Sequence, residues 1–420
     1  MRVIKGGVAA PVGFLAAGVQ AGVKYENKYD VALLYSLRPA AAAAVYTRNA
    51  VQAHPLVLTR AHLADGVAQA VAVNSGNANA CMGKQGEEAA LAMAQAAAGA
   101  LGLRPADVLV ASTGVIGQPL PLDKIRAGLA AAGAQISDLR AGAADGTAAA
   151  AAASPCGPRR AEAAHRAAQA IMTTDLTVKE MAWEIACAAG PVRLGVMAKG
   201  SGMIHPNMGT MLCFITTDAA LPAPLLREML REAVDDSFNM VTVDGDTSTN
   251  DMAVALANGC SGVELSGDER ELFRRALNTA CVAMARAIAQ DGEGAGKLLE
   301  TRVSGAAGRD DARKIARAVC ASNLVKTAMG GEDANWGRII AAAGYSGAEF
   351  DPGRVAISLN GLPVAAAGEG LPFSEAEAKE RLSRDEIVIE IFLAAGNAQA
   401  TAWGCDLTAA YVDINAGYRS

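Results

Sequence analysis

The stretch from Lys199 to Phe214, KGSGMIHPNMGTMLCF, decides how the rest of the chain is interpreted. A glycine-containing loop leads to Gly209 and Thr210, and the residues from Met211 onward are apolar and β-prone. This junction suits a peptide bond that breaks itself, because glycine leaves its carbonyl unshielded and permits a strained backbone. The Thr210 hydroxyl would attack that carbonyl, and the break would leave Thr210 with a free α-amine.

An α-amine beside a hydroxyl is a complete nucleophile and base. Its reference pKa of about 7.7–8.0 lets it accept a proton near neutral pH. The junction therefore predicts an acyl-transfer enzyme that makes its nucleophile by cutting itself. Because Gly-Thr pairs at strand starts are usually structural, the prediction depends on the other motifs of the chain.

The composition indicates a globular protein without a nucleic-acid or membrane partner. The 420 residues are 52% hydrophobic but only 4% aromatic, which favours close packing in two domains or one large two-lobed unit. A net charge of −6 gives no basic footprint. No apolar run reaches the roughly 18–20 residues of a membrane span. Glycines and Pro11 interrupt the apolar N-terminal stretch, so we expect a cytoplasmic protein.

Metal and nucleotide motifs are incomplete. The eight cysteines and four histidines lack zinc-ligand spacing, so we expect reduced, mostly buried thiols and no metal. DGDTSTND, starting at Asp244, lacks the glycine and glutamate of a calcium loop and is interpreted as a polar turn near a site. GEGAGK, starting at Gly292, fails the phosphate-loop pattern at both ends and remains a turn carrying Glu293.

Strand and helix patterns alternate irregularly, which favours α/β or α+β layers over a doubly wound sheet. Four strands are expected between residues 30 and 80: VALLYSL, AAVYTR, PLVLTR and QAVAVNSG. Helices are expected at 84–101, 122–133, 161–172, 224–238, 272–289 and 311–329. LLETRVSG, starting at Leu298, should open a C-terminal lobe, 298–420, whose last residues read as an aromatic strand. The alanine-rich residues 141–158 are interpreted as a surface helix and loop.

Two further features suit acyl transfer. In STGVIG, the Thr113 hydroxyl stands beside the Gly114 backbone N–H, and two such donors could hold an oxyanion. The alternative is an ordinary strand-ending turn. Lys199, eleven residues before Thr210, could pair with a substrate carboxylate or simply be solvated.

Taken together, the chain resembles the ornithine acetyltransferase family. The resemblance runs from GFLAAGVQAGVK to Ser420 and rests on KGSGMIHPNMGTML, ASTGVIG, AIMTTD, VTVDGDTSTND, DGEGAGKLLE, NWGRII and YVDINAGYRS. It implies self-cleavage between Gly209 and Thr210 into an α chain, 1–209, and a β chain, 210–420. Thr210 would be the nucleophile, with Thr113 and Gly114 as the oxyanion pair. The implied substrate-binding residues are Thr173 (with Thr174 as a weaker substitute), Lys199, Thr210, Glu293, Asn415 and Ser420.

The resemblance also implies a fold and an activity. The expected fold is a layered α/β sandwich, similar to but topologically distinct from N-terminal nucleophile hydrolases, with a smaller C-terminal α+β lobe. The expected reaction moves an acetyl group from N2-acetylornithine to glutamate without a cofactor. Acetyl-CoA as a second donor stays open, because no motif decides it. Two α and two β chains are expected to assemble.

The chain departs from the family pattern in two places. Gly209 replaces the usual alanine, which should preserve cleavage, and residues 141–160 look like a surface insertion. His205 is interpreted as a loop residue, because the Thr210 amine already supplies a base. The alternatives are a self-processing aminopeptidase or amidase with the same nucleophile, a nucleotide-binding module built on GEGAGK, and, least favoured, a scaffold.

Overall fold

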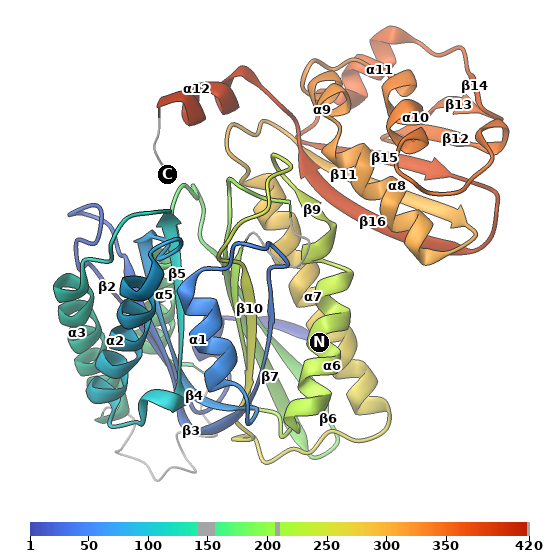
Figure 1. Cartoon of the computed structure of the whole chain (residues 1–420). Coiled ribbons are helices and arrows are strands. Elements are labelled where there is room, and N and C mark those ends of the chain that lie inside the picture. Colours follow the sequence, from blue (N-terminus) through green and yellow to red (C-terminus); the bar gives the residue numbers. More distant parts are fainter. Residues whose placement is uncertain (142–155, 206–210, 418–420) are drawn as a thin grey trace.

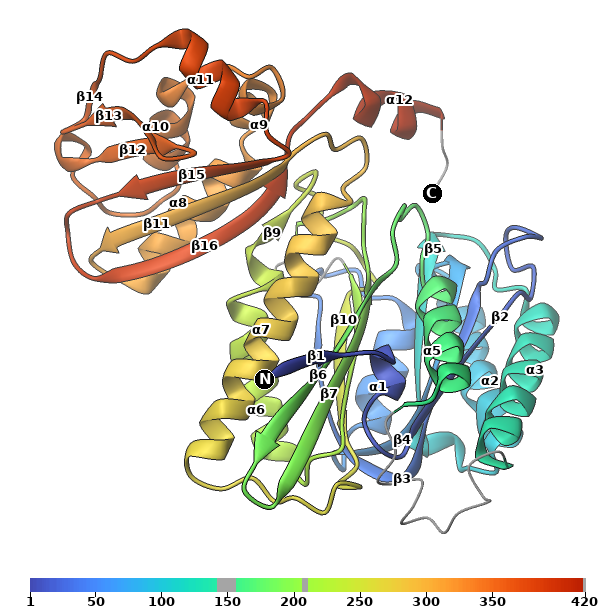
Figure 2. The same ribbon diagram turned by 180° about the vertical axis from the view of Figure 1, so that it is seen from behind.

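The computed structural model describes residues 1–141, 156–205 and 211–417, and two β-sheets organise this part of the chain. Figures 1 and 2 show a large unit of strands and helices, with a smaller lobe built from the C-terminal third of the sequence. The helix α12 leaves that lobe and lies above the large unit.

The larger sheet has nine strands among the described residues, in the order β1-β6-β7-β8-β10-β3-β4-β5, with β2 also paired to β3. Its strands are β1 Arg2–Ile4, β2 Phe14–Val19, β3 Val31–Tyr46, β4 Val67–Asn77, β5 Val108–Val115, β6 Lys179–Cys187, β7 Gly190–Lys199, β8 Leu212–Thr217 and β10 Met252–Ala257. Both parallel and antiparallel pairs occur, so this sheet is not doubly wound.

The strand β3 lets this sheet fold over on itself. Its first half pairs with β2 and β4, its second half pairs with β10, and its register with β4 shifts between Tyr35 and Ala40. β7 and β5 are five strands apart, a separation of roughly 24 Å in a flat sheet. Yet side chains at their ends, Lys199 and Thr113, come within 3.5 Å. The two halves therefore face each other.

The hydrophobic clusters agree with two facing layers. One cluster joins residues of both halves, such as Phe214 and Val254 with Val73 and Leu109. A second cluster packs α2 and α3 on the outer side of β2–β5, and a third packs α6 and α7 outside the other half. The helices of this unit are α1 His54–His62, α2 Gly83–Leu101, α3 Leu122–Ala141, α5 Pro158–Ala170, α6 Ala223–Asp235 and α7 Asp268–Gln290. The layered α/β arrangement predicted from the sequence is confirmed.

The smaller sheet has seven strands in the described residues, in the order β14-β13-β12-β15-β11-β16-β9. They are β9 Val241–Thr242, β11 Leu298–Ala306, β12 Ala356–Leu359, β13 Leu362–Ala366, β14 Glu369–Gly370, β15 Glu386–Phe392 and β16 Ala398–Cys405. The helices are α8 Arg309–Ala321, α9 Asn323–Gly330, α10 Trp336–Gly344, α11 Glu375–Leu382 and α12 Ala409–Gly417. The buried Lys326 ammonium donates to the carbonyls of Val243 and Cys405, which ties this lobe to the segment after β9.

Three expectations about local structure were wrong. PLVLTR forms helix α1 instead of a strand, because Leu56 and Thr59, three residues apart, face the interior and the Thr59 hydroxyl bonds to Val110. The segment 311–329 forms two helices, since Ser322 ends α8 and caps α9. The chain forms helix α12 at Ala409–Gly417, in which the Asn415 side-chain amide donates to the carbonyl of Tyr411 four residues earlier. The expectation for 141–158 falls almost wholly outside the described residues.

Candidate active site

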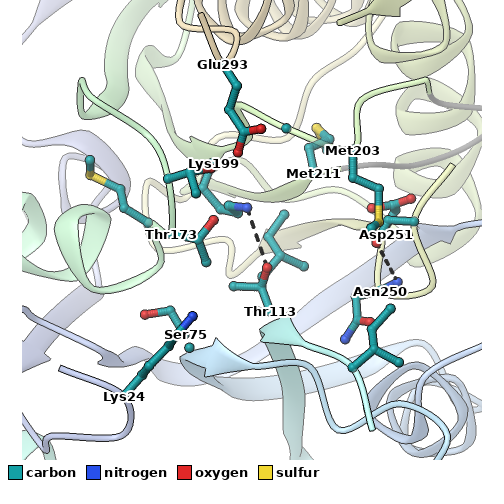
Figure 3. Close-up of a pocket in the computed structure, with 18 of the residues that line it drawn as sticks. Lys24, Ser75, Thr113, Thr173, Lys199, Met203, Met211, Asn250, Asp251 and Glu293 are labelled. Atoms are coloured by element: carbon teal, nitrogen blue, oxygen red, sulfur yellow. Dashed lines mark hydrogen bonds between the residues drawn. The ribbon is translucent and has the colours of Figure 1, made fainter. Parts of the chain in front are cut away.

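A cavity opens where the strand ends of the larger sheet meet the turn after α7 and the helix α12 (Figure 3). It contains about 1140 Å³ of space between protein atoms, part of it open to solvent. Six residues predicted from the sequence lie in the described part of the chain, and all six line this cavity: Thr113, Gly114, Thr173, Lys199, Glu293 and Asn415. Thr174 lines it as well.

The oxyanion candidates stand at the end of β5, where it runs parallel to β4. Thr113 lies opposite Ser75 and Gly114 opposite Gly76 in this pair. Gly114 has φ +129°, and a Cβ built on it would lie 2.3 Å from the carbonyl carbon of Gly76. Only glycine fits here, so two backbones approach each other beside the Thr113 hydroxyl. An asparagine network centred on Asn74 and Asn250 fixes this strand end, through Ser112.

Lys199 ends β7 and points its ammonium at Thr113, as Figure 3 shows. Its Nζ lies 3.5 Å from the Thr113 Oγ1 and 4.0 Å from the Asp175 carboxylate. The Lys199 residue is only 7% exposed, so its charge is held within the protein and not by bulk water. The solvated-lysine alternative is therefore wrong for this residue.

Glu293 and Asn415 lie 122 residues apart in the sequence and meet at the cavity. The Asn415 amide donates to Glu293 at 2.9 Å. Glu293 lies against Gly202, where a Cβ would come 2.4 Å from its carboxyl group. The Glu293 backbone N–H bonds to the carbonyl of Ser201, so the turn after α7 is fastened to the loop after β7. GEGAGK thus forms a turn that presents one carboxylate to the cavity.

The polar turn DGDTSTND lines the same cavity, as its composition suggested. Asp244 accepts the backbone N–H groups of Met203 and Ile204, at 2.5 and 2.8 Å. Burial raises the pKa of the Asp244 carboxyl, and these N–H groups oppose that effect. Burial, followed by the charges of Asp244 and Glu293, raises the pKa of Tyr411 to about 12. Tyr411 is therefore a neutral hydroxyl at physiological pH.

The segment KYENKYD, between β2 and β3, supplies lining residues that were not predicted. Lys24 and Lys28 each lie over the ring of Tyr25, with 5.2 and 5.3 Å to its centroid. Asp30 closes the segment by accepting the backbone N–H groups of Ala21 and Val23. The only signal in the sequence was the close spacing of lysine and tyrosine between two strands, which by itself does not indicate a site.

The remaining predicted residues, Gly209, Thr210 and Ser420, lie outside the described residues. Met211 and Leu212, which directly follow Thr210 in the sequence, line the cavity. Leu212 pairs with Lys199 of β7 on one side and with Met252 of β10 on the other. The start of β8 is thus fixed between two strands at the edge of the cavity.

His205 does not line the cavity. Its ring contacts the Thr242 hydroxyl at 3.0 Å and the Arg317 guanidinium at 3.1 Å. Burial and the Arg317 charge lower the pKa of His205 to about 4.

In the part of the chain that the structure covers, no three or more His, Cys, Asp or Glu side chains are grouped as metal ligands. Within that same part, no helix is both long and apolar enough to cross a membrane.

Comparison with known proteins gives matches along the whole chain. The model of the ArgJ family matches residues 15–420. The arginine biosynthesis bifunctional protein ArgJ of Symbiobacterium thermophilum is 54% identical over 425 residues, which cover 100% of both chains. The corresponding ArgJ 1 protein of Clostridium acetobutylicum is 46% identical over 97% of this chain and 96% of its own. A crystal structure of ArgJ from Bacillus halodurans, 45% identical, covers 49% of this chain and 98% of its own with a TM-score of 0.48.

Proposed function

This chain belongs to the ArgJ family, and on that basis we propose that it transfers an acetyl group from N2-acetylornithine to glutamate through an acetyl ester on Thr210. The resemblance stated from the sequence is confirmed, and the chain is an acyltransferase of arginine biosynthesis. The substrates, the ester and the self-cleavage are the proposed part.

One observation carries the proposal: six residues from distant parts of the sequence, selected for acyl transfer, line a single cavity with Met211. Met211 follows Thr210 directly in the sequence, and its place in the cavity lining supports Thr210 as the proposed nucleophile. A donor pair, a buried cation and a carboxylate thus stand around one space, which is the set of groups that acyl transfer to an amino acid requires.

We propose that the chain cuts itself between Gly209 and Thr210. The Thr210 hydroxyl attacks the Gly209 carbonyl, and the C–N bond breaks, so that the α-amine of Thr210 is freed and Gly209 is held as an ester. Water then hydrolyses this ester, which leaves a carboxylate on Gly209 and restores the Thr210 hydroxyl. Pairing in the sheet supports a product that stays together: β7 of the first fragment pairs with β8 of the second, and β10 of the second pairs with β3 of the first. The two fragments share one sheet.

Acetyl transfer then follows in two steps. The Thr210 α-amine accepts the hydroxyl proton as the Thr210 oxygen attacks the acetyl carbonyl of N2-acetylornithine. Thr113 and Gly114 donate to the developing oxyanion, and ornithine leaves with the proton. The glutamate amine attacks the acetyl ester in the same way and leaves as N-acetylglutamate, restoring the Thr210 hydroxyl. One amide replaces a similar amide, so the reaction needs no energy source.

The charged residues suit the two amino acids. Lys199 would attract a substrate carboxylate and Glu293 the side-chain ammonium of ornithine. Acetyl-CoA as a second donor would give the same acetyl ester on Thr210. We further propose that two cleaved copies assemble as two α and two β chains, which a native molecular mass would test.

The experiment compares the wild-type protein with Thr210→Ala. The wild-type protein should migrate as two fragments and convert N2-acetylornithine and glutamate into ornithine and N-acetylglutamate. Thr210→Ala should stay one chain and transfer nothing, since both the cut and the ester need this hydroxyl. A cleaved and active Thr210→Ala protein would refute the proposal. Release of free acetate in preference to transfer, with glutamate present, would favour the amidase alternative.

A further inference from the structure

Asp175 does not line the cavity but contacts two residues of the predicted site, Thr173 and Lys199. Its Oδ1 accepts the Gly200 N–H at 2.7 Å and the Lys179 ammonium at 2.8 Å. Its Oδ2 accepts the Thr173 N–H at 3.0 Å and faces the Lys199 ammonium at 4.0 Å. The Asp175 side chain has no exposed surface. A fully buried carboxylate with this many charged and N–H partners holds them in fixed positions.

The contact between Lys199 and Thr113 has a directional consequence. A lysine ammonium only donates hydrogen bonds, whereas a hydroxyl has one hydrogen and two lone pairs. When Lys199 approaches Thr113 Oγ1, the oxygen must accept, so its own hydrogen has to point elsewhere. Thr113, Gly114 and Ser75 all line the cavity, and Figure 3 shows the Thr113 side chain in it with the Lys199 ammonium on one side. The Thr113 hydrogen is therefore available to an oxyanion in the cavity.

We propose that Asp175 is a positioning residue: it aims Lys199 at Thr113 and so orients the Thr113 hydroxyl as an oxyanion donor. This inference rests on the proposed acetyl transfer and adds to it a task for Lys199 beyond holding a substrate carboxylate. Asp175 touches no reacting atom and acts through Lys199.

A neighbouring aspartate provides a matched control. Asp291 is also buried and accepts the Lys179 ammonium at 2.5 Å, with the N–H groups of Leu176 and Thr177. Asp175 and Asp291 therefore share Lys179, but of these two carboxylates only Asp175 lies within ion-pair distance of Lys199. Asparagine at either position removes one buried negative charge from the same cluster while keeping the side-chain shape. The two variants should lose comparable stability.

The first test measures kcat of the fully cleaved proteins in acetyl transfer. Asp175→Asn should lower kcat about tenfold and change KM little, because the donor acts in the transition state. Asp291→Asn should keep kcat within about twofold. The decisive comparison repeats Asp175→Asn in a Thr113→Val background, where no hydroxyl remains to orient. There the same substitution should change kcat by no more than about twofold, since effects through one shared group do not add.

A second variant, Lys199→Met, tests the same inference if Asp175→Asn does not fold. Lys199→Met keeps the aliphatic stem and leaves Asp175 paired with Lys179. If Lys199 orients Thr113, this variant lowers kcat about tenfold with Thr113 present and hardly at all with Thr113→Val. If Lys199 only binds a carboxylate, KM rises equally in both backgrounds and the inference is overturned. Equal kcat losses in Asp175→Asn and Asp291→Asn, or full additivity with Thr113→Val, would overturn it as well.

Different results would refute the proposed function and the proposed role of Asp175. A wild-type protein that does not move acetyl groups from N2-acetylornithine to glutamate would refute the proposed function. A wild-type protein that does so, together with additive variants, would leave that function intact and remove only the role of Asp175.

Discussion

The cavity has two unlike sides. The strand side consists of Thr113, Gly114 and Lys199, which end β5 and β7 and are backed by the buried Asp175. The helix side consists of Glu293, Tyr411 and Asn415, from the turn after α7 and from α12, a helix without a single buried residue. Donors on the strand side are fixed by sheet pairing and buried charge, whereas the helix side consists of a turn and an exposed helix that are joined by the hydrogen bond from Asn415 to Glu293.

This difference matches two requirements of the proposed reaction. Stabilising an oxyanion needs donors whose positions are set before the reaction begins. Accepting first acetylornithine and then glutamate, which differ in side-chain charge, needs a side that adjusts. The comparison predicts that substitutions on the strand side lower kcat, whereas substitutions on the helix side change KM for one substrate.

The largest effect is expected for Gly114→Ala. A methyl group here meets the Gly76 backbone at 2.3 Å in a conformation with φ +129°, so the strand end must shift and the donor pair is lost. We expect kcat to fall about 10²–10³-fold, measured in the acetyl-transfer assay.

Gly117→Ala is its matched control, three residues further on. It also has positive φ, +74°, but no heavy atom lies within 4 Å of the position that its methyl group would take. It should cost about 1 kcal/mol of stability and leave kcat within about twofold. Equal kcat losses in the two alanine variants would contradict the claim that the backbone position of Gly114 supports the oxyanion donors.

Glu293→Gln should act on one substrate. Loss of the negative charge removes a charge-assisted contact with the ornithine ammonium, so KM for N2-acetylornithine should rise about 10–100-fold. KM for glutamate should change much less. Glu228→Gln, which alters an exposed ion pair with Arg274, serves as the control and should change neither value. A fall in kcat for Glu293→Gln with unchanged KM would contradict this assignment, because it would mean that Glu293 acts in the transition state and not in binding ornithine.

Acid should weaken the strand side through Asp175. Although burial alone would raise its pKa, Lys199, Lys179 and the Gly200 N–H together lower the pKa of Asp175 from 3.8 to about 2. A lowered native pKa adds stability above pH 4 that is lost as pH falls towards 2, amounting to about 2 kcal/mol. Chemical denaturation at pH 4 and pH 2 should show this loss, and Asp175→Asn should show less of it. Equal losses in both proteins would contradict the assignment.

The smallest effect is expected for Asn415→Ala. This residue is exposed and donates one hydrogen bond to Glu293 at 2.9 Å, so its removal loosens the carboxylate without removing it. KM for N2-acetylornithine should rise about threefold at constant kcat, by the same steady-state assay. A larger effect than that of Glu293→Gln would mean that Asn415 binds the substrate more directly than Glu293.

The layered fold and six residues that line the cavity could be predicted from the sequence, but for different reasons. Strong periodic segments such as β5 and α2 determine their own structure, whereas PLVLTR has the apolar run of a strand and becomes α1 because its packing against β5 decides. The predicted site residues were identified by their resemblance to family motifs. Their arrangement could not be predicted in this way, because Lys199 lies beside Thr113 only where the larger sheet folds over at β3.

The site residues that could not be predicted act through tertiary contacts. Asp175 belongs to the TTD motif, yet its partners Lys199 and Gly200 lie 24 and 25 residues away. Tyr411 was not predicted because its raised pKa depends on burial and on the charges of Asp244 and Glu293, near which α12 places it. Contacts of this kind follow from chain topology and not from local pattern.

The most direct test of the central claim is the mass of the second fragment after incubation with N2-acetylornithine in the absence of glutamate. The proposed mechanism predicts a fragment beginning at Thr210 that gains the mass of one acetyl group, located on the Thr210 side chain, and that loses it when glutamate is added. An uncut chain, or a cut fragment that transfers acetyl groups without ever carrying one at Thr210, would contradict it.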